Sequence, residues 1–179
     1  MRLITPKTLA TLAGATVAFT GIAVLNSAPA SAGLAHFTGQ LQVQGDQTYL
    51  DEGAGTDVLA RAAASTGQTW VFDKVDYAFE SVGVFTVKGS TSGKCVTAKG
   101  IGQAVVQEPC RSGDLTQRWI IDVSQDTTLI RSHGDLGLVL HTTGVGQPVA
   151  GSPAPNTGGG PSGAGLPGSP DQNWIVYQD

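Results

Sequence analysis

The sequence predicts an all-β fold of three pseudo-symmetric repeats with about twelve strands, and three observations predict it. Gln-x-Trp followed by two apolar residues occurs three times, in GQTWVF (67–72), TQRWII (116–121) and DQNWIV (171–176), and these motifs hold all three tryptophans of the chain. A second block, upstream of the motif, repeats in register with it. Short runs of alternating apolar and polar residues, separated by glycine, are typical of strands and turns. Since one repeat cannot bury its own apolar face, the three must share a core.

The upstream block supplies the strands between successive tryptophans. CVTAKGIGQAVVQEPC (95–110) aligns without a gap with VLHTTGVGQPVAGSPA (139–154), and YLDEGAGTDVLARAA (49–63) joins them with one deletion. VLARAAAS (58–65) has a helical composition, but its position in the repeat predicts a strand and a turn. The repeats extend over about 38–74, 75–123 and 124–178.

Each tryptophan is expected to be the large apolar anchor of its repeat. Trp70, Trp119 and Trp174 follow a glutamine at the same spacing and precede two apolar residues. A buried indole contributes a large apolar area to a core. We expect the glutamine two residues earlier to be a partly buried amide that satisfies backbone groups in the turn where it lies.

The first 32 residues have the features of an export signal. Arg2 and Lys7 accompany an apolar stretch from Leu9 to Leu25, and APASA offers a small-x-small cleavage site after Ala32. A membrane anchor is the alternative, but glycine and threonine dilute the apolar stretch. We therefore expect a cleaved signal peptide (1–32), one domain over 33–179, and a secreted, extracellular protein that keeps no membrane span.

The net charge of the mature chain argues against nucleic-acid binding. Without Arg2 and Lys7, eight basic residues remain against fourteen acidic ones, so the net charge is about −6. A protein that binds nucleic acid presents a basic surface to the phosphates. We therefore expect no nucleic-acid partner.

Cys95 and Cys110 are expected to form a structural disulfide. An even number of cysteines in an exported chain favours a bridge over free thiols. The closed loop has about 15 residues, for which a bridge contributes on the order of 3 kcal/mol. The alternative is a nucleophilic cysteine, but neither residue lies in a catalytic signature.

Together these features resemble the ricin B-type β-trefoil family of lectins and carbohydrate-binding domains. The resemblance rests on the three Gln-x-Trp motifs, a Cys-Val at the start of one block, a Gly-x-Gly-Gln centre and a second cysteine before Gln-x-Trp. It covers about residues 38–178. It implies a β-trefoil fold and a non-catalytic module that binds a glycan, either a galactose-like sugar or a polysaccharide.

A sugar site of this family has three parts. An aspartate accepts hydrogen bonds from sugar hydroxyls, an aromatic ring two residues before the second cysteine stacks on the pyranose, and an asparagine directly before Gln-x-Trp completes the polar set. No repeat holds all three parts. In that order the positions hold Asp51, Arg61 and Gly67 in the first repeat, Thr97, Glu108 and Thr116 in the second, and His141, Ser152 and Asp171 in the third.

The resemblance singles out four candidate carbohydrate-binding residues. Asp51 and Gln68 make the first repeat the most nearly complete, and Tyr49 can lend a ring only if the loop differs from the family's. His141 and Asp171 occupy two polar positions of the third repeat. The alternatives are a solvated turn residue for Asp51 and a structural histidine for His141. We expect glycan binding to be weak, altered or absent, and the second repeat to be structural.

A trefoil interaction protein or protease inhibitor is the second class of function considered. The Pro- and Gly-rich insert at 155–170 is longer than the matching segments of the other repeats. It is expected to be a tolerated surface loop, because lengthening a loop costs little free energy, or else a protruding recognition loop. In the second case the partner is another protein.

Catalysis is not expected. The chain has no Gly-x-Ser-x-Gly elbow, no His-Glu-x-x-His motif and no Gly-rich phosphate loop that follows a strand into a helix. His36, His133 and His141 are not paired at the spacing of metal ligands. We expect neither a metal nor a cofactor.

Overall fold

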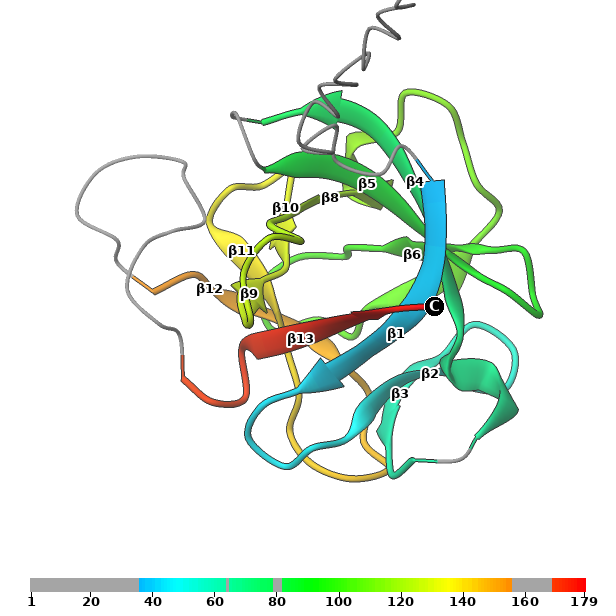
Figure 1. Ribbon diagram of the computed structural model, residues 1–179, viewed down its shortest axis with the longest axis vertical. Helices are drawn as coiled ribbons and strands as arrows, with labels where there is room; N and C mark the ends of the chain where they lie inside the picture. The colour runs from blue at the N-terminus through cyan, green and yellow to red at the C-terminus, as the bar shows by residue number, and fades with distance from the viewer. Residues whose placement is uncertain (1–35, 64, 79–81, 156–168) are drawn as a thin grey trace, which may run out of the picture.

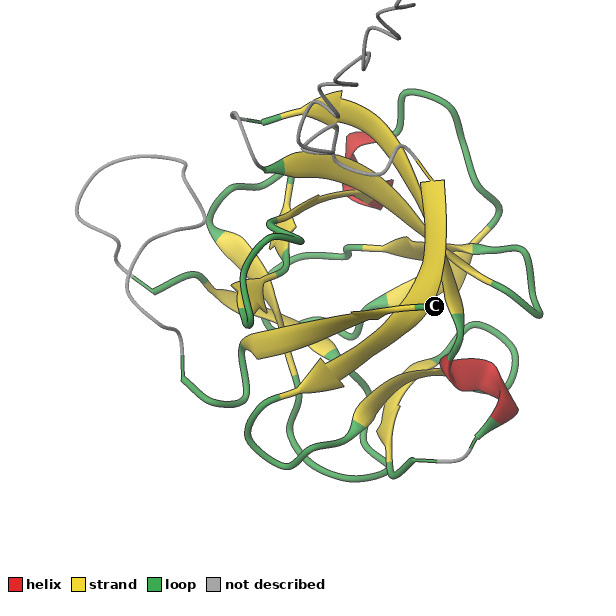
Figure 2. Ribbon diagram, viewed as in Figure 1, coloured by secondary structure: helices red, strands yellow, loops and turns green. Residues whose placement is uncertain are grey.

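A computed structural model of the chain describes residues 36–63, 65–78, 82–155 and 169–179 (Figure 1). The predicted signal peptide and nearly all of the predicted insert lie outside these residues. Within them the chain forms strands, turns and two short 3-10 helices, with no α-helix (Figure 2). The all-β prediction is confirmed. No helix of this part of the chain is long and apolar enough to span a membrane.

The strands group into three units. The first holds β1 (His36–Val43), β2 (Tyr49–Glu52), β3 (Val58–Arg61), the 3-10 helix η1 (Thr66–Gln68) and β4 (Trp70–Tyr77). The second holds β5 (Gly83–Gly89), β6 (Cys95–Thr97), β7 (Val106–Glu108), η2 (Leu115–Gln117) and β8 (Arg118–Ile121). The third holds β9 (Thr128–Leu129), β10 (Arg131–Ser132), β11 (Leu138–His141), β12 (Ala150–Pro153) and β13 (Asn173–Gln178).

The outer strands of the units close into a barrel. Antiparallel pairs run from β1 through β4, β5 and β8 to β10, and from β9 through β13 back to β1. In Figure 1 the last strand, β13, lies beside the first, β1. β9 and β10 are consecutive segments of the chain, so the ring closes between them, and closure of this kind removes the long exposed edges of an open sheet.

The inner strands of each unit form a hairpin, and the three hairpins pair with one another. The hairpins are β2–β3, β6–β7 and β11–β12. Isolated bridges join every hairpin to the other two, through the pairs Asp57–Val106, Leu59–Pro148 and Ala104–Ala150. The units therefore meet around one common axis. The fold is the β-trefoil that the resemblance implies.

The third unit has one more strand than its counterparts. Its first strand is divided at Ile130 into β9 and β10, so that the sheet has 13 strands and not the predicted twelve. Strand β9 pairs with β13 whereas β10 pairs with β8, so the segment changes partner at the division. Ile130 itself is fully buried in the core. The extra strand is a division of an expected strand.

The three tryptophans occupy equivalent places in the core. All three side chains are fully buried. Each indole Nε1 donates a hydrogen bond to a carbonyl oxygen of the first hairpin strand of its own unit. The pairs are Trp70 to Leu50 at 3.0 Å, Trp119 to Val96 at 3.0 Å and Trp174 to Leu140 at 3.2 Å. A motif repeated in sequence is therefore a contact repeated in space, because one indole fills the core of each unit and anchors its hairpin.

The glutamine of each motif ties together the turn before its tryptophan. In every unit the amide Nε2 donates to a carbonyl and the amide Oε1 accepts from a backbone N–H. The partners are Ala62 O (2.7 Å) and Ser65 N (3.3 Å) for Gln68, Pro109 O (3.1 Å) and Arg111 N (2.8 Å) for Gln117, and Pro153 O (3.1 Å) and Ser169 N (3.3 Å) for Gln172. These bonds satisfy backbone groups of the turn, as expected from the sequence.

Candidate functional site

The residue that follows each indole-bound carbonyl lies at the same place in all three units. Asp51, Thr97 and His141 each come directly after the carbonyl that accepts the indole hydrogen bond. On the facing strand the equivalent residues are Arg61, Glu108 and Ser152, which pair in register with Tyr49, Cys95 and Val139. The alignment of the repeats in sequence is therefore also their alignment in space.

The first unit contains a pocket of about 450 Å³. Its walls come from three segments: the β2–β3 hairpin, the turn that leads into η1, and the turn after β5. The lining residues are Asp51, Glu52, Gly53, Ala54, Gly55, Arg61, Ser65, Thr66, Gly67, Thr91 and Ser92. Hydroxyls and backbone groups dominate this list, and no aromatic ring belongs to it.

Asp51 lies within β2, and its side chain is only 2% exposed. The alternative interpretation of Asp51 as a solvated turn residue is therefore wrong. Its carboxylate atom Oδ2 is buried and has no hydrogen-bond partner. Leaving a buried acceptor unsatisfied costs about 1–3 kcal/mol, and more when the group is charged. Asp51 thus keeps an unused acceptor next to the pocket.

Arg61 supplies the cation that faces Asp51. Its Nε lies 3.5 Å from Asp51 Oδ1, and its side chain is 48% exposed. Arg61 stands where the family places its stacking ring, so a charged group covers the aspartate in place of an aromatic plane. The alignment of the repeats showed that Arg61 replaces the ring, but it did not predict the ion pair with Asp51. The sequence did contain a signal for this pair, because Arg61 lies across the hairpin from the strand that carries Asp51.

Glu52 joins the pocket to the second unit. Its carboxylate oxygens accept hydrogen bonds from the backbone N–H groups of Thr91 at 3.0 Å and Ser92 at 2.8 Å. In return, Lys94 Nζ donates to the carbonyl of Gly55 at 3.0 Å. Two turns from different units are thereby held together as one wall. Sequence analysis missed Glu52, because its partners lie about forty positions further along the chain.

Gly67 lines the pocket, and Gln68, the next residue, bonds to the turn that carries this part of the lining. Gln68 is 1% exposed, and both ends of its amide are bonded to the turn. It therefore fixes the conformation of the turn that precedes η1. Gly67 lies so close to β2 that an added Cβ would meet the backbone oxygen and nitrogen of Glu52 at 3.0 and 3.1 Å. An asparagine at this position would fit tightly, and the backbone of β2 would have to shift by a few tenths of an ångström to accept it.

Gly67→Asn is expected to lower the free energy of unfolding by about 1–3 kcal/mol, because the new side chain must displace the backbone of Glu52. Urea denaturation followed by far-UV circular dichroism measures the change. Thr66→Asn at the neighbouring exposed position is the matched control and should stay within roughly 0.5 kcal/mol of the wild type. Equal stability of the two variants would show that β2 yields easily at this point.

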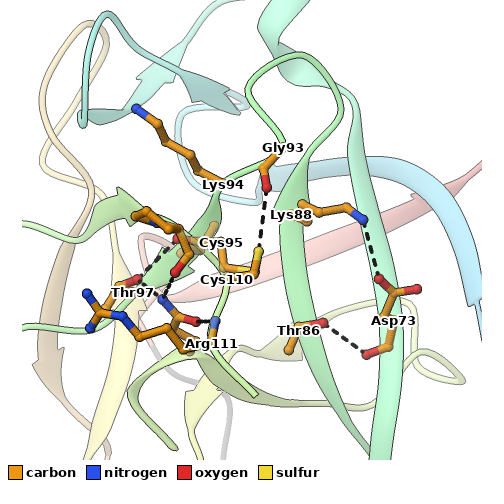
Figure 3. The surroundings of a disulfide bond; sticks show 12 residues. Asp73, Thr86, Lys88, Gly93, Lys94, Cys95, Thr97, Cys110 and Arg111 are labelled. Carbon is orange, nitrogen blue, oxygen red and sulfur yellow. Dashed lines mark hydrogen bonds and ion pairs between the residues drawn. A yellow bond between two sulfur atoms is a disulfide. The ribbon is translucent and has the colours of Figure 1, made fainter. Parts of the chain in front are cut away.

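In the second unit the polar groups are occupied by internal bonds. Thr97 is 1% exposed; its hydroxyl donates to Cys95 O and accepts from Gln117 Nε2, both at 3.1 Å. The disulfide Cys95–Cys110 lies beside it (Figure 3). Glu108 pairs with Lys99. The prediction of a structural disulfide is confirmed, and the Thr97 and Glu108 positions carry internal contacts.

Thr116, at the asparagine position of the second unit, is bonded to Asp114. Its hydroxyl and its backbone N–H both donate to Asp114 Oδ1, at 2.6 and 3.0 Å. These two bonds, the hydroxyl first, hold the pKa of Asp114 below its ordinary value. Asp114 thereby caps η2, and the exposed hydroxyl of Thr116 has its donor occupied.

In the third unit His141 and Asp171 are neighbours at the surface. The N–H of Thr142, next to His141, donates to the carbonyl of Asp171 at 3.1 Å. His141 is half-buried and Asp171 is exposed. Ser152, at the ring position, accepts a hydrogen bond from Gln172 Nε2 at 2.6 Å. The two candidate residues are brought together, and the ring position beside them holds Ser152 and no aromatic residue.

No group of three or more histidine, cysteine, aspartate or glutamate side chains in the described ranges is arranged to hold a metal ion. His36 on β1 and Asp73 on β4 are hydrogen-bonded at the surface, with Lys88 at 3.7 Å from the same aspartate. These three groups lie away from the residues that line the pocket. They contribute to the barrel surface.

A family model described as a ricin-type β-trefoil lectin domain-like model matches residues 66–155, half of the chain. This chain belongs to that family. The match includes the tryptophans of the first two units and the whole β11–β12 hairpin. Comparison with curated proteins gave no match.

Solved structures share the ricin-type β-trefoil fold with this chain at low sequence identity. A designed threefold-symmetric protein, ThreeFoil, is 18% identical with a TM-score of 0.58, over 78% of this chain and 97% of that one. The C-half of the earthworm R-type lectin, solved with GalNAc, is 12% identical with a TM-score of 0.53, over 80% and 99%. The Polyporus squamosus lectin, bound to Neu5Acα2-6Galβ1-4GlcNAc, is 22% identical with a TM-score of 0.60, over 81% of this chain and 50% of that one.

Proposed function

We propose that this protein is a secreted, non-catalytic carbohydrate-binding module whose working site is the pocket of the first unit. The observation that carries the proposal is the buried carboxylate of Asp51, whose Oδ2 has no hydrogen-bond partner and which lines a pocket of about 450 Å³. A buried acceptor without a donor is completed by a ligand hydroxyl, and a carboxylate accepts such bonds strongly.

The class of ligand follows from the lining. Besides the charged groups of Glu52 and Arg61, the lining contains the hydroxyl residues Ser65, Thr66, Thr91 and Ser92. Their hydroxyls both donate and accept hydrogen bonds, as sugar hydroxyls do. Two of the related lectins were solved with GalNAc and with a galactose-containing sialoside. A galactose-like sugar is therefore the proposed ligand.

The affinity for a single sugar is expected to be low. Arg61 already pairs with Oδ1 of Asp51, so a sugar hydroxyl competes with this cation for the same carboxylate. No aromatic ring lines the pocket to cover the C–H face of a pyranose. Without that apolar contact, we expect a Kd of roughly 1 mM or weaker for a monosaccharide, which corresponds to about −4 kcal/mol.

Asp51→Asn should abolish measurable binding of galactose, because the amide replaces a charged acceptor by a weaker one and brings two donors of its own. Binding is measured by saturation-transfer NMR and isothermal titration of the secreted chain with galactose, after a glycan array has been used to rank sugars. Asp57→Asn, an exposed aspartate of the same hairpin, is the matched control and should bind as the wild type does.

Two results would contradict the proposal. Unchanged affinity in Asp51→Asn would place the site elsewhere, with His141 and Asp171 the next residues to replace. If the wild-type protein bound no sugar on the array, the carbohydrate-binding function would be rejected. Inhibition of a protease by that same preparation would then favour a protein-interaction role.

A further inference from the structure

A row of polar and aromatic side chains lies on the outer face of β1, β2 and β13. Residues of β1 alternate between the core and the outside, so that Gln40 and Gln42 are partly exposed while Leu41 and Val43 are buried. Gln40 stands opposite Tyr177 in the β1–β13 register, and Gln42 stands opposite Tyr49 in the β1–β2 register. We call these four residues the tyrosine strip.

The two rings of the tyrosine strip lie side by side. Their centroids are 6.4 Å apart, with the planes inclined by 33°. Tyr177 is 43% exposed. Its hydroxyl donates to Gln42 Oε1 at 2.9 Å, and Gln42 Nε2 in turn donates to Gln47 O at 3.1 Å. The amide therefore fixes the orientation of an aromatic ring that solvent reaches.

The tyrosine strip is continuous with the pocket. Tyr49 and Asp51 lie two positions apart in β2 and so project from the same face of the hairpin. Arg61, directly opposite Tyr49 in β3, pairs with Asp51 and lines the pocket. A path therefore leads from Asp51 past Arg61 and Tyr49 to Tyr177.

The charge along this path is balanced. The strip itself consists of two phenols and two amides, and Arg61 is compensated by Asp51. Amides and phenols hydrogen-bond to neutral polar ligands, and exposed rings cover the C–H faces of sugars. The position of the family's stacking ring holds Arg61, whereas the ring of Tyr49 stands opposite Arg61 and that of Tyr177 beside Tyr49.

We propose that the tyrosine strip is a second binding surface, which holds the further sugars of a neutral glycan chain whose end occupies the pocket. The inference rests on the proposed function and specifies its ligand as an oligosaccharide or polysaccharide of uncharged sugars. Asp51 engages the first sugar, and the rings of Tyr49 and Tyr177 cover the next ones.

The test compares the affinities of galactose, β-1,4-galactobiose and β-1,4-galactotetraose by isothermal titration. The wild-type protein should bind the tetraose at least roughly 10-fold more tightly than galactose. Tyr177→Ala should lose most of this gain while its affinity for galactose stays the same. Tyr177→Phe keeps the ring and should keep the gain. Tyr77→Ala removes an exposed tyrosine of β4 and is the matched control.

The outcomes separate the two proposals. If binding requires Asp51 but does not grow with chain length, or if Tyr177→Ala keeps the gain, the tyrosine strip is not a binding surface and the pocket proposal stands. If the wild-type protein binds none of the three saccharides, both proposals are overturned. An unchanged melting temperature of Tyr177→Ala confirms that the loss is local.

Discussion

Trp119→Ala is expected to lower the free energy of unfolding by about 3–5 kcal/mol. The indole is fully buried, so its removal leaves a cavity in a core that the neighbouring units cannot refill. The carbonyl of Val96 also loses the hydrogen bond that it receives from Nε1 at 3.0 Å. A natural domain has about 5–15 kcal/mol of stability in total, so this one change consumes a large part of it.

Urea denaturation measures the effect, with Trp119→Phe as a milder variant should the alanine variant fail to fold. Trp119→Phe keeps most of the ring volume and should cost about 1–3 kcal/mol. Pseudo-symmetry predicts similar losses for Trp70→Ala and Trp174→Ala. Tyr77→Ala, at a 63% exposed position, should cost no more than about 1 kcal/mol. A loss as small in one of the tryptophan variants would show that its unit is anchored by other contacts.

Removing the disulfide is the second change with a large expected effect. Cys95 pairs with Glu108 in register across the β6–β7 hairpin, and Cys110 follows two residues later, so the bridge closes the open end of this hairpin. The residues that it spans are 15 apart in sequence. For a loop of this length the bridge contributes on the order of 3 kcal/mol, which corresponds to a lower Tm by roughly 6–12 °C.

The double variant Cys95→Ala/Cys110→Ala should therefore melt earlier but remain folded, because Val96 and Val105 of the hairpin stay in the core. Calorimetry with and without reductant measures the difference. The double variant is its own control for the reductant, which should not shift its Tm. If the reduced and oxidised wild-type proteins had the same Tm, the disulfide would not stabilise the folded state.

The fold was predictable from the sequence because its main contacts are repeated. Trp70, Trp119 and Trp174 mark the same contact three times, and each glutamine before them marks the same turn. A pattern that occurs three times can be recognised even where one copy is irregular. The division of one strand at Ile130 was not predictable, because it depends on which neighbours the strand meets on each side.

The candidate site was predictable only in part. Alignment of the repeats identified Asp51 and its equivalents, because a residue keeps its place in the repeat even when its type changes. The alignment did not predict which other residues these side chains contact. Glu52 meets the Thr91–Ser92 turn of another unit, and the rings of Tyr49 and Tyr177 come together from opposite ends of the domain. Contacts of that kind depend on closure of the barrel and leave no periodic trace in the sequence.

The pairing of β1 with β13 has a consequence for biosynthesis. β1 can pair with β2 and β4 early, but the edge that pairs with β13 stays open during translation until that last strand has been made. An open strand edge can pair with another chain. Neighbouring nascent chains could therefore pair with one another through β1 until β13 has been synthesised. The rate of folding should therefore depend on residues 173–178, the strand that also carries Tyr177 of the tyrosine strip.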